Sequence, residues 1–257
     1  MELLNFSTNQ IQAFKTSFEV IDSLVSDTNF EVTPLGIRIR EINRTSKLFL
    51  SVFFSADNFD IWNYYSGTDV FNVGIDITNI VNALKPNLHY DVLTFSLTSS
   101  KGNLVLESFE RNEKKCVTFD LLPPCPNTSG VIENKVYSHS VELSSELITK
   151  YAKDINRTSN LIKIKLGRKV LSVGSADGNL EYQLSGGGIS ITTDDSSHTN
   201  CSAVECTMNV KYFLLSCKCS NISELITIYI GDIYDDDHFP TVKFNLGSLG
   251  TLSLSLF

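Results

Sequence analysis

Three basic residues recur at helical spacing in the stretch from 144 to 157. Lys150, Lys153 and Arg157 are separated by three and four positions, which places their side chains on one face of an α-helix. The whole chain has a formal net charge of -8. A row of cations on an acidic protein can attract the phosphates of a nucleic acid while the remaining surface repels them. The stripe therefore predicts a local phosphate-binding face, although any soluble protein also solvates its helices with lysine and arginine.

The composition is that of a folded protein with a sizeable core. The chain has 257 residues, 42% of them hydrophobic and 10% aromatic, with six prolines, and this excludes a disordered chain. No run of about 18 apolar residues is present to cross a membrane. The opening MELLNFSTNQ lacks the basic and apolar regions of a secretory signal. We therefore expect an intracellular, soluble protein with one large all-β domain or two domains of about 130 residues.

Cysteine spacing gives no sign of a metal site or of a disulfide framework. The six cysteines form no Cys-x-x-Cys pair and the four histidines are scattered, so we expect reduced, mostly buried thiols and no metal. Six Asn-x-Ser/Thr sequons keep a secreted β-rich binding protein open as an alternative, because glycosylation matters only in a secreted protein. These sequons begin at Asn5, Asn43, Asn127, Asn156, Asn200 and Asn221.

The sequence motifs of common enzymes are absent. There is no Gly-x-Ser-x-Gly, His-Glu-x-x-His, Walker or Gly-x-Gly-x-x-Gly motif. Residues 186–188 are three glycines without the following Lys-Ser/Thr of a phosphate loop, and residues 235–238 are Asp-Asp-Asp-His without a second cluster to complete a metal shell. Both segments are typical of solvated loops. We therefore predict that the protein is not an enzyme and that it has no cofactor.

Helix and strand patterns follow one another in a similar order in the two halves of the chain. Apolar spacing predicts helices at 10–25, 78–86, 144–157 and 208–219. Alternating apolar segments between them predict strands, and residues 186–200 read as a polar loop. Residues 123–135 hold half of the prolines without periodicity, as a linker does. We predict an α+β protein with similar β-rich domains at 1–122 and 137–257, joined by a connector at 123–136.

Several segments resemble, in order, the eukaryotic and archaeal sliding clamp family, proliferating cell nuclear antigen (PCNA). In the first half these are the turn at Gly36, the patch Phe59-Asp60-Ile61-Trp62 and the helix entry from Gly74 to Lys85. In the second half they are SADGNLEYQLS, the pair Lys211-Tyr212 and the final hairpin around Gly250. The resemblance covers nearly the whole chain.

This resemblance implies an architecture and a function. Each clamp protomer has two similar β-rich domains with helices on the inner side, and three protomers close into a homotrimeric ring around double-stranded DNA. The ring tethers a DNA polymerase and other replication or repair proteins without reading base sequence. A clamp loader is a further partner, and the expected location is the nucleus or, for a DNA virus, the viral replication compartment. A subunit of a heterotrimeric checkpoint clamp is the nearest alternative.

The resemblance also assigns the DNA-facing cations, which the predicted helices carry. By position they are Lys15, Lys85, Lys150, Lys153, Arg157, Lys211 and Lys218. The same helices carry four carboxylates, on Glu19, Asp22, Glu146 and Asp154. Asp22 and Asn82 stand where many clamps have lysine, so we expect the first half to hold DNA more weakly than the second.

A partner site is implied under the connector, where clamps accept a short motif that ends in two aromatic residues. By position its walls are Ile42, Lys47, Phe49, Val131, Ile132, Phe239, Pro240 and Leu256. Lys47 departs from the apolar residue that is usual there.

Subunit contacts in the family come from edge strands that pair between protomers. Here the resemblance selects the strands from Cys116 to Leu122 and from Asn179 to Ser185. Edges of this kind need a partner, because an unpaired edge exposes backbone hydrogen-bonding groups. The interface residues are Cys116, Thr118, Asp120, Leu180, Tyr182 and Leu184. An edge that a loop covers within the monomer is the alternative.

Overall fold

The computed structural model divides the chain into two compact units. It describes residues 2–43, 48–85, 91–98, 102–110, 113–124, 137, 139–167, 169–185, 189–193, 204–230 and 240–256. The first unit consists of residues 1–43, 50–130 and 246–252, and the second of residues 44–49, 131–245 and 253–257. Most of the predicted connector, residues 125–136, lies outside the described part. The predicted domain boundaries therefore stay predictions.

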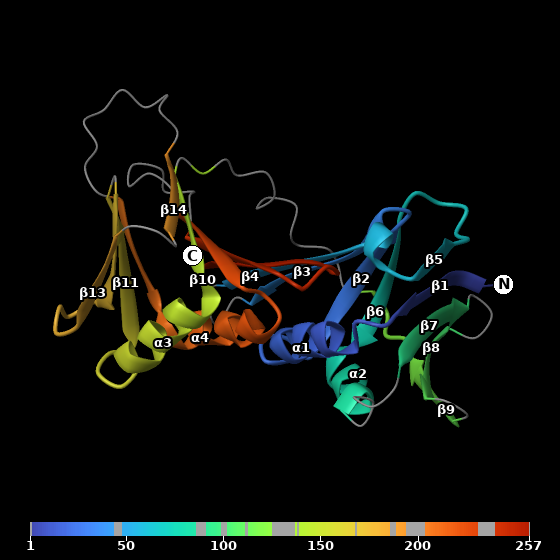
Figure 1. The fold of residues 1–257 in the computed structure, drawn as a ribbon. Coiled ribbons are helices and arrows are strands. Elements are labelled where there is room, and N and C mark those ends of the chain that lie inside the picture. The colour runs from blue at the N-terminus through green and yellow to red at the C-terminus, as the bar shows by residue number, and fades with distance from the viewer. Residues whose placement is uncertain are drawn as a thin grey trace. The chain divides into compact units, whose positions relative to one another are not determined.

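The first unit combines strands with the helices α1 and α2 and the short 3-10 helix η1 (Figure 1). Its elements are β1 (Glu2–Thr8), α1 (Ile11–Asp22), β2 (Asp27–Thr33), β3 (Gly36–Asn43), β4 (Leu48–Ser55), η1 (Ala56–Asn58), β5 (Ile61–Tyr64), β6 (Phe71–Asp76), α2 (Ile77–Leu84), β7 (Val92–Thr98), β8 (Asn103–Glu110) and β9 (Glu113–Asp120). One sheet has the order β5-β1-β7-β8-β9, and a second run has the order β4-β3-β2-β6. β9 is thus an edge strand.

The second unit repeats this plan. Its elements are β10 (His139–Ser144), α3 (Ser145–Ile155), β11 (Leu161–Leu166), β12 (Val170–Ser175), β13 (Glu181–Ser185), β14 (Ile189–Thr193), β15 (Val204–Asn209), α4 (Val210–Ser216), η3 (Cys217–Asn221), β16 (Leu225–Ile230), β17 (Thr241–Asn245) and β18 (Gly250–Leu256), the last of which contributes to both units. The sheet β13-β12-β11-β15 has β13 as an edge, and a second run has the order β14-β10-β16-β17-β18. α3 and α4 pack together and against the first of these sheets (Figure 1).

An aromatic core explains why α1 lies on its sheet. Phe14 of α1 is buried, with its ring 5.2 Å from that of Phe95 on β7, and Phe6 on β1 stacks on Phe95 at 4.9 Å. Aromatic pairs of this kind add to the burial of apolar area. A close approach also shapes the β2–β3 turn, where Gly36 has φ 142° and an added Cβ would lie 2.0 Å from the carbonyl oxygen of Phe54. Only glycine fits there.

The predicted helices are all present, and one predicted loop is wrong. The fourth helix is divided into α4 and the 3-10 helix η3. The stretch 186–200, which we expected to be a loop, contains β14, because Ile189 and Ile191 alternate with Ser190 and Thr192 and pair with β10. Such alternation is the signature of a strand even in a Ser/Thr-rich segment. Residues 186–188 and 235–238 lie outside the described residues.

No helix in the described ranges combines the length and the apolar character that crossing a bilayer requires.

Candidate nucleic-acid interface

The basic stripe lies on a well-anchored helix. The α3 residues Ile148, Ala152 and Ile155 are buried. The opposite face of the helix is therefore exposed to solvent. The Ser144 hydroxyl accepts a hydrogen bond from the Leu147 N–H at 3.4 Å and caps the first turn. The exposed face then carries the three cations, and Lys153 lies in the last turn, where a cation complements the helix dipole.

A groove separates this face of α3 from η3. It has a volume of about 460 Å³, and α3 and η3 are in contact beside it. Its lining combines cations with hydroxyl, amide and carboxylate groups, namely Glu146, Thr149, Lys150, Lys153, Asp154, Arg157, Ser220 and Asn221. Such a lining can contact phosphate oxygens through both charge and neutral donors.

The cations of the second unit are exposed to solvent. The side chain of Arg157 is 79% exposed, with Nη1 3.5 Å from Asp154 Oδ1, a surface pair that holds the guanidinium weakly. Lys150 and Lys153 are exposed on α3, as are Lys211 at the start of α4 and Lys218 on η3. All five predicted contacts in this unit are therefore on the surface of its helical layer.

The helices of the first unit differ. The Lys15 side chain is only 12% exposed, and its Nζ lies 3.8 Å from Glu19 Oε1. Lys85 is exposed and donates to Asn82 Oδ1 at 3.0 Å. Asp22 accepts a hydrogen bond from Thr78 at 2.6 Å, which joins α1 to α2. Lys15 thus has a carboxylate beside it and Lys85 an amide, and the carboxylates of Glu19 and Asp22 balance these two cations in charge.

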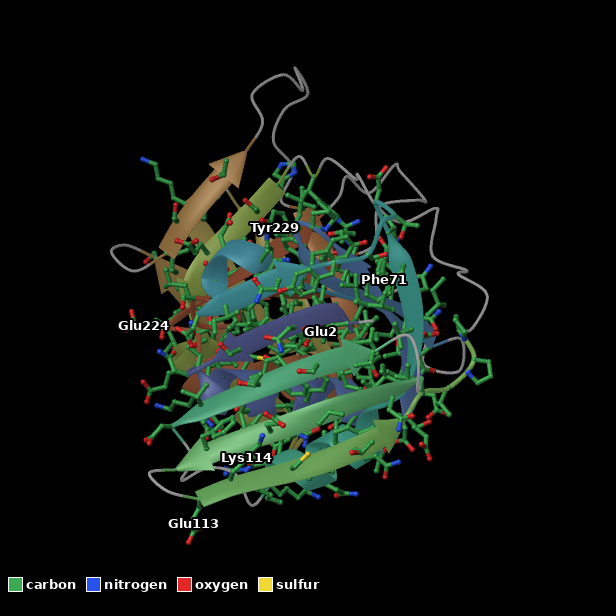
Figure 2. All side chains as sticks on the ribbon, turned by 90° about the vertical axis from the view of Figure 1, so that its right-hand side faces the viewer. Glu2, Phe71, Glu113, Lys114, Glu224 and Tyr229 are labelled. Atoms are coloured by element: carbon green, nitrogen blue, oxygen red, sulfur yellow. The ribbon has the colours of Figure 1, made fainter. Side chains whose placement is uncertain are left out.

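The edge strand β9 shows two different faces. Cys116, Thr118 and Asp120, the predicted interface residues, are exposed. The alternate residues Val117 and Phe119 are half-buried and lie opposite the buried Leu106 and Leu104 of β8, so they share the core face of the sheet. Sequence reasoning did not select these two, although they continue the apolar layer to the open edge. Figure 2 looks onto this sheet, where Glu113 and Lys114 mark one end of β9.

The other edge strand, β13, carries its apolar residues on the helix side. Tyr182 and Leu184 are half-buried and lie opposite the buried Val173 and Leu171 of β12. The Tyr182 ring stacks on Tyr151 of α3 with centroids 4.1 Å apart and planes at 16°. Desolvation, together with the hydrogen bond that Tyr182 donates to Asp154, raises the pKa of this phenol. Leu180 precedes the strand and is half-buried. Tyr151 was not selected from the sequence.

The predicted partner site is described only in part. Lys47, Val131, Ile132 and Phe239 lie outside the described residues, and of Leu256 the structure describes only its place in β18. Phe49 is 3% exposed, because the run from 48 to 50 in β4 is entirely buried, so its side chain belongs to the core. Ile42 and Pro240 are half-buried and belong to different units. This site stays a prediction.

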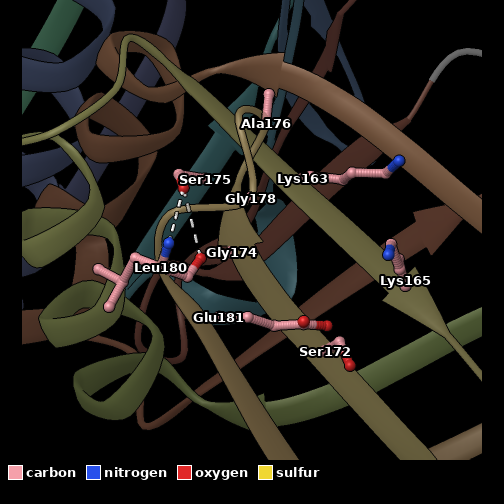
Figure 3. A pocket seen from close by; sticks show the side chains of 9 residues that line it. All are labelled: Lys163, Lys165, Ser172, Gly174, Ser175, Ala176, Gly178, Leu180 and Glu181. Atoms are coloured by element: carbon pink, nitrogen blue, oxygen red, sulfur yellow. Dashed lines mark hydrogen bonds between the residues drawn. The ribbon is translucent and has the colours of Figure 1, made fainter.

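A small hollow on the other face of the β13 sheet holds two lysines (Figure 3). Its volume is about 110 Å³. Lys163 Nζ lies 2.8 Å from Glu205 Oε1, and this hydrogen bond lowers the pKa of Glu205. Glu181 lines the hollow together with Lys165. Carboxylates thus balance the lysines, so the hollow lacks the excess positive charge of the α3–η3 groove.

Metal-ligating side chains do not gather anywhere in the described part of the chain, where no group of three or more His, Cys, Asp or Glu residues is placed to hold an ion. Of the cysteines there, Cys116, Cys206 and Cys219 are free thiols.

Comparison with known proteins identifies the fold. No protein-family model matches the chain. The chain is 19% identical over 258 residues to the probable DNA polymerase sliding clamp 1 of Paramecium bursaria Chlorella virus 1, a match that covers 97% of this chain and 94% of that protein. It superposes on the crystal structure of PCNA from Entamoeba histolytica with a TM-score of 0.84 and 17% identity, covering 100% of this chain and 98% of that one. The resemblance inferred from the sequence and the α+β clamp fold are therefore confirmed.

Proposed function

We propose that this protein is a DNA sliding clamp, a processivity factor that encircles duplex DNA and tethers a DNA polymerase to it. The observation that carries the proposal is the exposed cation cluster of α3, α4 and η3, which occurs on a chain of clamp fold with net charge -8. The full-length similarity to a viral sliding clamp supports the same function.

The mechanism is topological. A closed ring cannot leave duplex DNA without opening, while phosphate contacts from exposed lysine and arginine are screened by salt and exchange readily. Contacts to the backbone carry no base information, so the ring slides without sequence preference. The protein acts as a non-enzymatic scaffold.

Assembly into a homotrimer would pair β9 of one copy with β13 of the next. Both are edge strands in their sheets, and both carry half-buried apolar residues on the face that continues the core. A paired edge would cover these residues and satisfy the open backbone groups. The three copies would then present three sets of the α3–η3 groove.

Partner proteins would dock through a short motif that ends in two aromatics. Calorimetry with such a peptide tests this site, since buried aromatic anchors supply most of the binding free energy of small interfaces. A clamp loader and a replication compartment, nuclear or viral, complete the proposed setting.

The decisive experiment loads the protein onto nicked circular plasmid and then linearises the plasmid. A topological clamp stays with the circle during gel filtration and is released from the linear DNA, whereas a protein that binds through contacts alone remains bound to both. Light scattering on the purified protein gives the mass of the assembly. A monomer that assembles only with unlike subunits would favour a checkpoint-clamp subunit instead.

A further inference from the structure

The edge strand β5 of the first unit carries large apolar side chains that are exposed to solvent. β1 lies on one side of β5, and no other strand in the described part of the chain pairs with the second side. Ile61 is 48% exposed, and Tyr65, directly after the strand, is 51% exposed. Val70, in the loop that follows, is 46% exposed. Single exposed apolar residues are normal on a protein, whereas a group of them beside an open edge indicates an interaction surface.

The backbone of β5 offers hydrogen-bonding groups at this edge. The Tyr65 N–H donates to the Leu3 carbonyl of β1 at 2.9 Å, and the β1–β5 register continues without a shift. Along an antiparallel strand, residues that bond to one neighbour alternate with residues whose N–H and carbonyl point the other way. Trp62 and Tyr64 therefore direct these groups away from β1. An extended peptide can pair with them and become the next strand of the sheet.

The segment that contains β5 is acidic. Between Lys47 and Lys85 the sequence has four aspartates and no lysine or arginine, a charge of -4 out of the chain's -8. Three of these aspartates are exposed and flank the strand in sequence, namely Asp57 in η1, Asp60 immediately before β5 and Asp69 in the loop after it. Natural sheets commonly protect an open edge with lysine. β5 lacks this protection and carries the opposite charge at its ends.

We propose that the β5 edge binds an extended basic segment of a partner protein as an added strand. Apolar side chains at alternate positions of this segment would contact Ile61 and Tyr65, which share one face of the sheet and lie about 13 Å apart along it. Lysine or arginine at the two ends of the segment would pair with Asp60 and Asp69. The site lies within the first unit, so its occupation does not depend on assembly of a ring.

Charge selects this occupant over the alternatives. Duplex DNA is repelled by the aspartates of the edge. A second copy that paired its own β5 with this edge would bring Asp57, Asp60 and Asp69 against the same residues, and like charges at an interface lower affinity. A basic segment gains the backbone ladder and the attraction of opposite charges together.

The probe is the synthetic peptide KKVTVTVKK, in which valines alternate between basic ends. Trp62 is the only tryptophan of the chain and lies in β5 itself, with its ring 5.7 Å from Phe6 on the core face, so its fluorescence reports occupation of the edge. We expect saturable binding with a change in Trp62 emission. The peptide KKVPVPVKK keeps every charge and every valine but lacks the two N–H groups that would donate to the Trp62 and Tyr64 carbonyls. It should bind at least about fivefold more weakly.

Two variants test the apolar contacts. I61S/Y65S removes them, and L161S/L225S makes a matched change at two exposed leucines of the second unit. We expect I61S/Y65S to weaken binding of KKVTVTVKK by about five- to twentyfold and the control to change it by less than about twofold. All four side chains are exposed, so the native circular dichroism should be kept. Should I61S/Y65S fail to fold, the comparison of the two peptides on the native chain still decides.

Two further variants test the charges. D60N/D69N removes two carboxylates of the edge, and E142Q/E224Q makes the same charge change at exposed positions of the second unit. We expect D60N/D69N to weaken peptide binding by about three- to tenfold at low salt. The control should have a smaller effect, because its charges lie outside the edge.

Four outcomes would overturn the β5 site. A native chain that does not bind KKVTVTVKK has no such site, and binding without a change in Trp62 emission places the peptide elsewhere. Equal affinity for the two peptides, or equal losses in each variant and its control, would show attraction by net charge alone. If I61S/Y65S lowers the mass of the native assembly or its affinity for duplex DNA, the occupant is a second copy or DNA. The peptide assay contains no DNA, so its failure would leave the plasmid experiment on the clamp unaffected.

Discussion

The hydroxyl of Tyr182 donates a hydrogen bond to Asp154 Oδ2 at 3.2 Å. The other oxygen of this carboxylate lies 3.5 Å from Arg157 Nη1. One carboxylate therefore connects the edge strand β13 with the last cation of the basic stripe. Asp154 also lines the α3–η3 groove, so its charge opposes the phosphates that the groove would hold.

Removal of this charge should strengthen DNA binding. We expect Asp154→Asn to raise the affinity for a short duplex by about two- to fivefold at low salt, because one repulsive surface charge is worth below about 1 kcal/mol. Fluorescence anisotropy measures the change. Glu142→Gln makes the same charge change at an exposed position on β10 and should have a smaller effect. Equal effects of both substitutions would attribute the change to net charge alone.

Reversal of the stripe should weaken binding and flatten its salt dependence. Each phosphate contact contributes about 0.9 to the slope of log affinity against log salt, so loss of three contacts in K150E/K153E/R157E should reduce the slope by about 3. The matched control is K165E/K169E/K243E, with the same charge change at positions in the second unit that are outside its helices. The assignment to DNA fails if the two triple variants show one slope.

Lys15 should contribute little to DNA binding. Its side chain is 12% exposed and lies beside Glu19. The ammonium group is therefore less accessible to a DNA phosphate than the sequence predicted. We expect Lys15→Gln to change duplex affinity by less than about twofold, and Lys153→Gln to weaken it more, as a phosphate contact does. Anisotropy at one low salt concentration compares the two. A larger loss for Lys15→Gln would mean that its ammonium group reaches the phosphates.

The sequence was sufficient for the elements that depend on local periodicity and insufficient for contacts between them. The stripe of α3 follows from helical spacing and the Ser144 cap. The contact of Tyr182 with Asp154 joins residues 28 positions apart, and no local pattern contains it. Alternation in β9 showed two faces but not which one meets the core, so Phe119 was missed. Phe49 was selected by position in the family, yet burial of its whole segment places it in the core.

Cys116 should report on assembly. It is exposed on β9 and would be covered by a second copy. We expect alkylation of Cys116 to slow as the chain concentration rises through the trimerisation range. Burial raises the pKa of Cys206 and Cys219 to about 12, so at pH 8 only about one in ten thousand of these thiols is the reactive thiolate, and they should stay unmodified. Peptide mass mapping assigns each thiol. Alkylation that is independent of concentration would remove Cys116 from the interface.

Gly74 should be required for the first unit to close its edge. A Cβ at this position would lie 2.5 Å from the carbonyl oxygen of Leu122 and 2.7 Å from that of Pro123, and backbone atoms cannot yield as a flexible side chain does. We expect Gly74→Ala to lower the free energy of unfolding by about 1 to 3 kcal/mol, the usual cost of overpacking. Gly67→Ala is the control, because a Cβ there meets nothing within 4 Å. Urea unfolding of both variants compares them. A Gly74→Ala variant as stable as the native chain would contradict the close contact between Gly74 and Leu122.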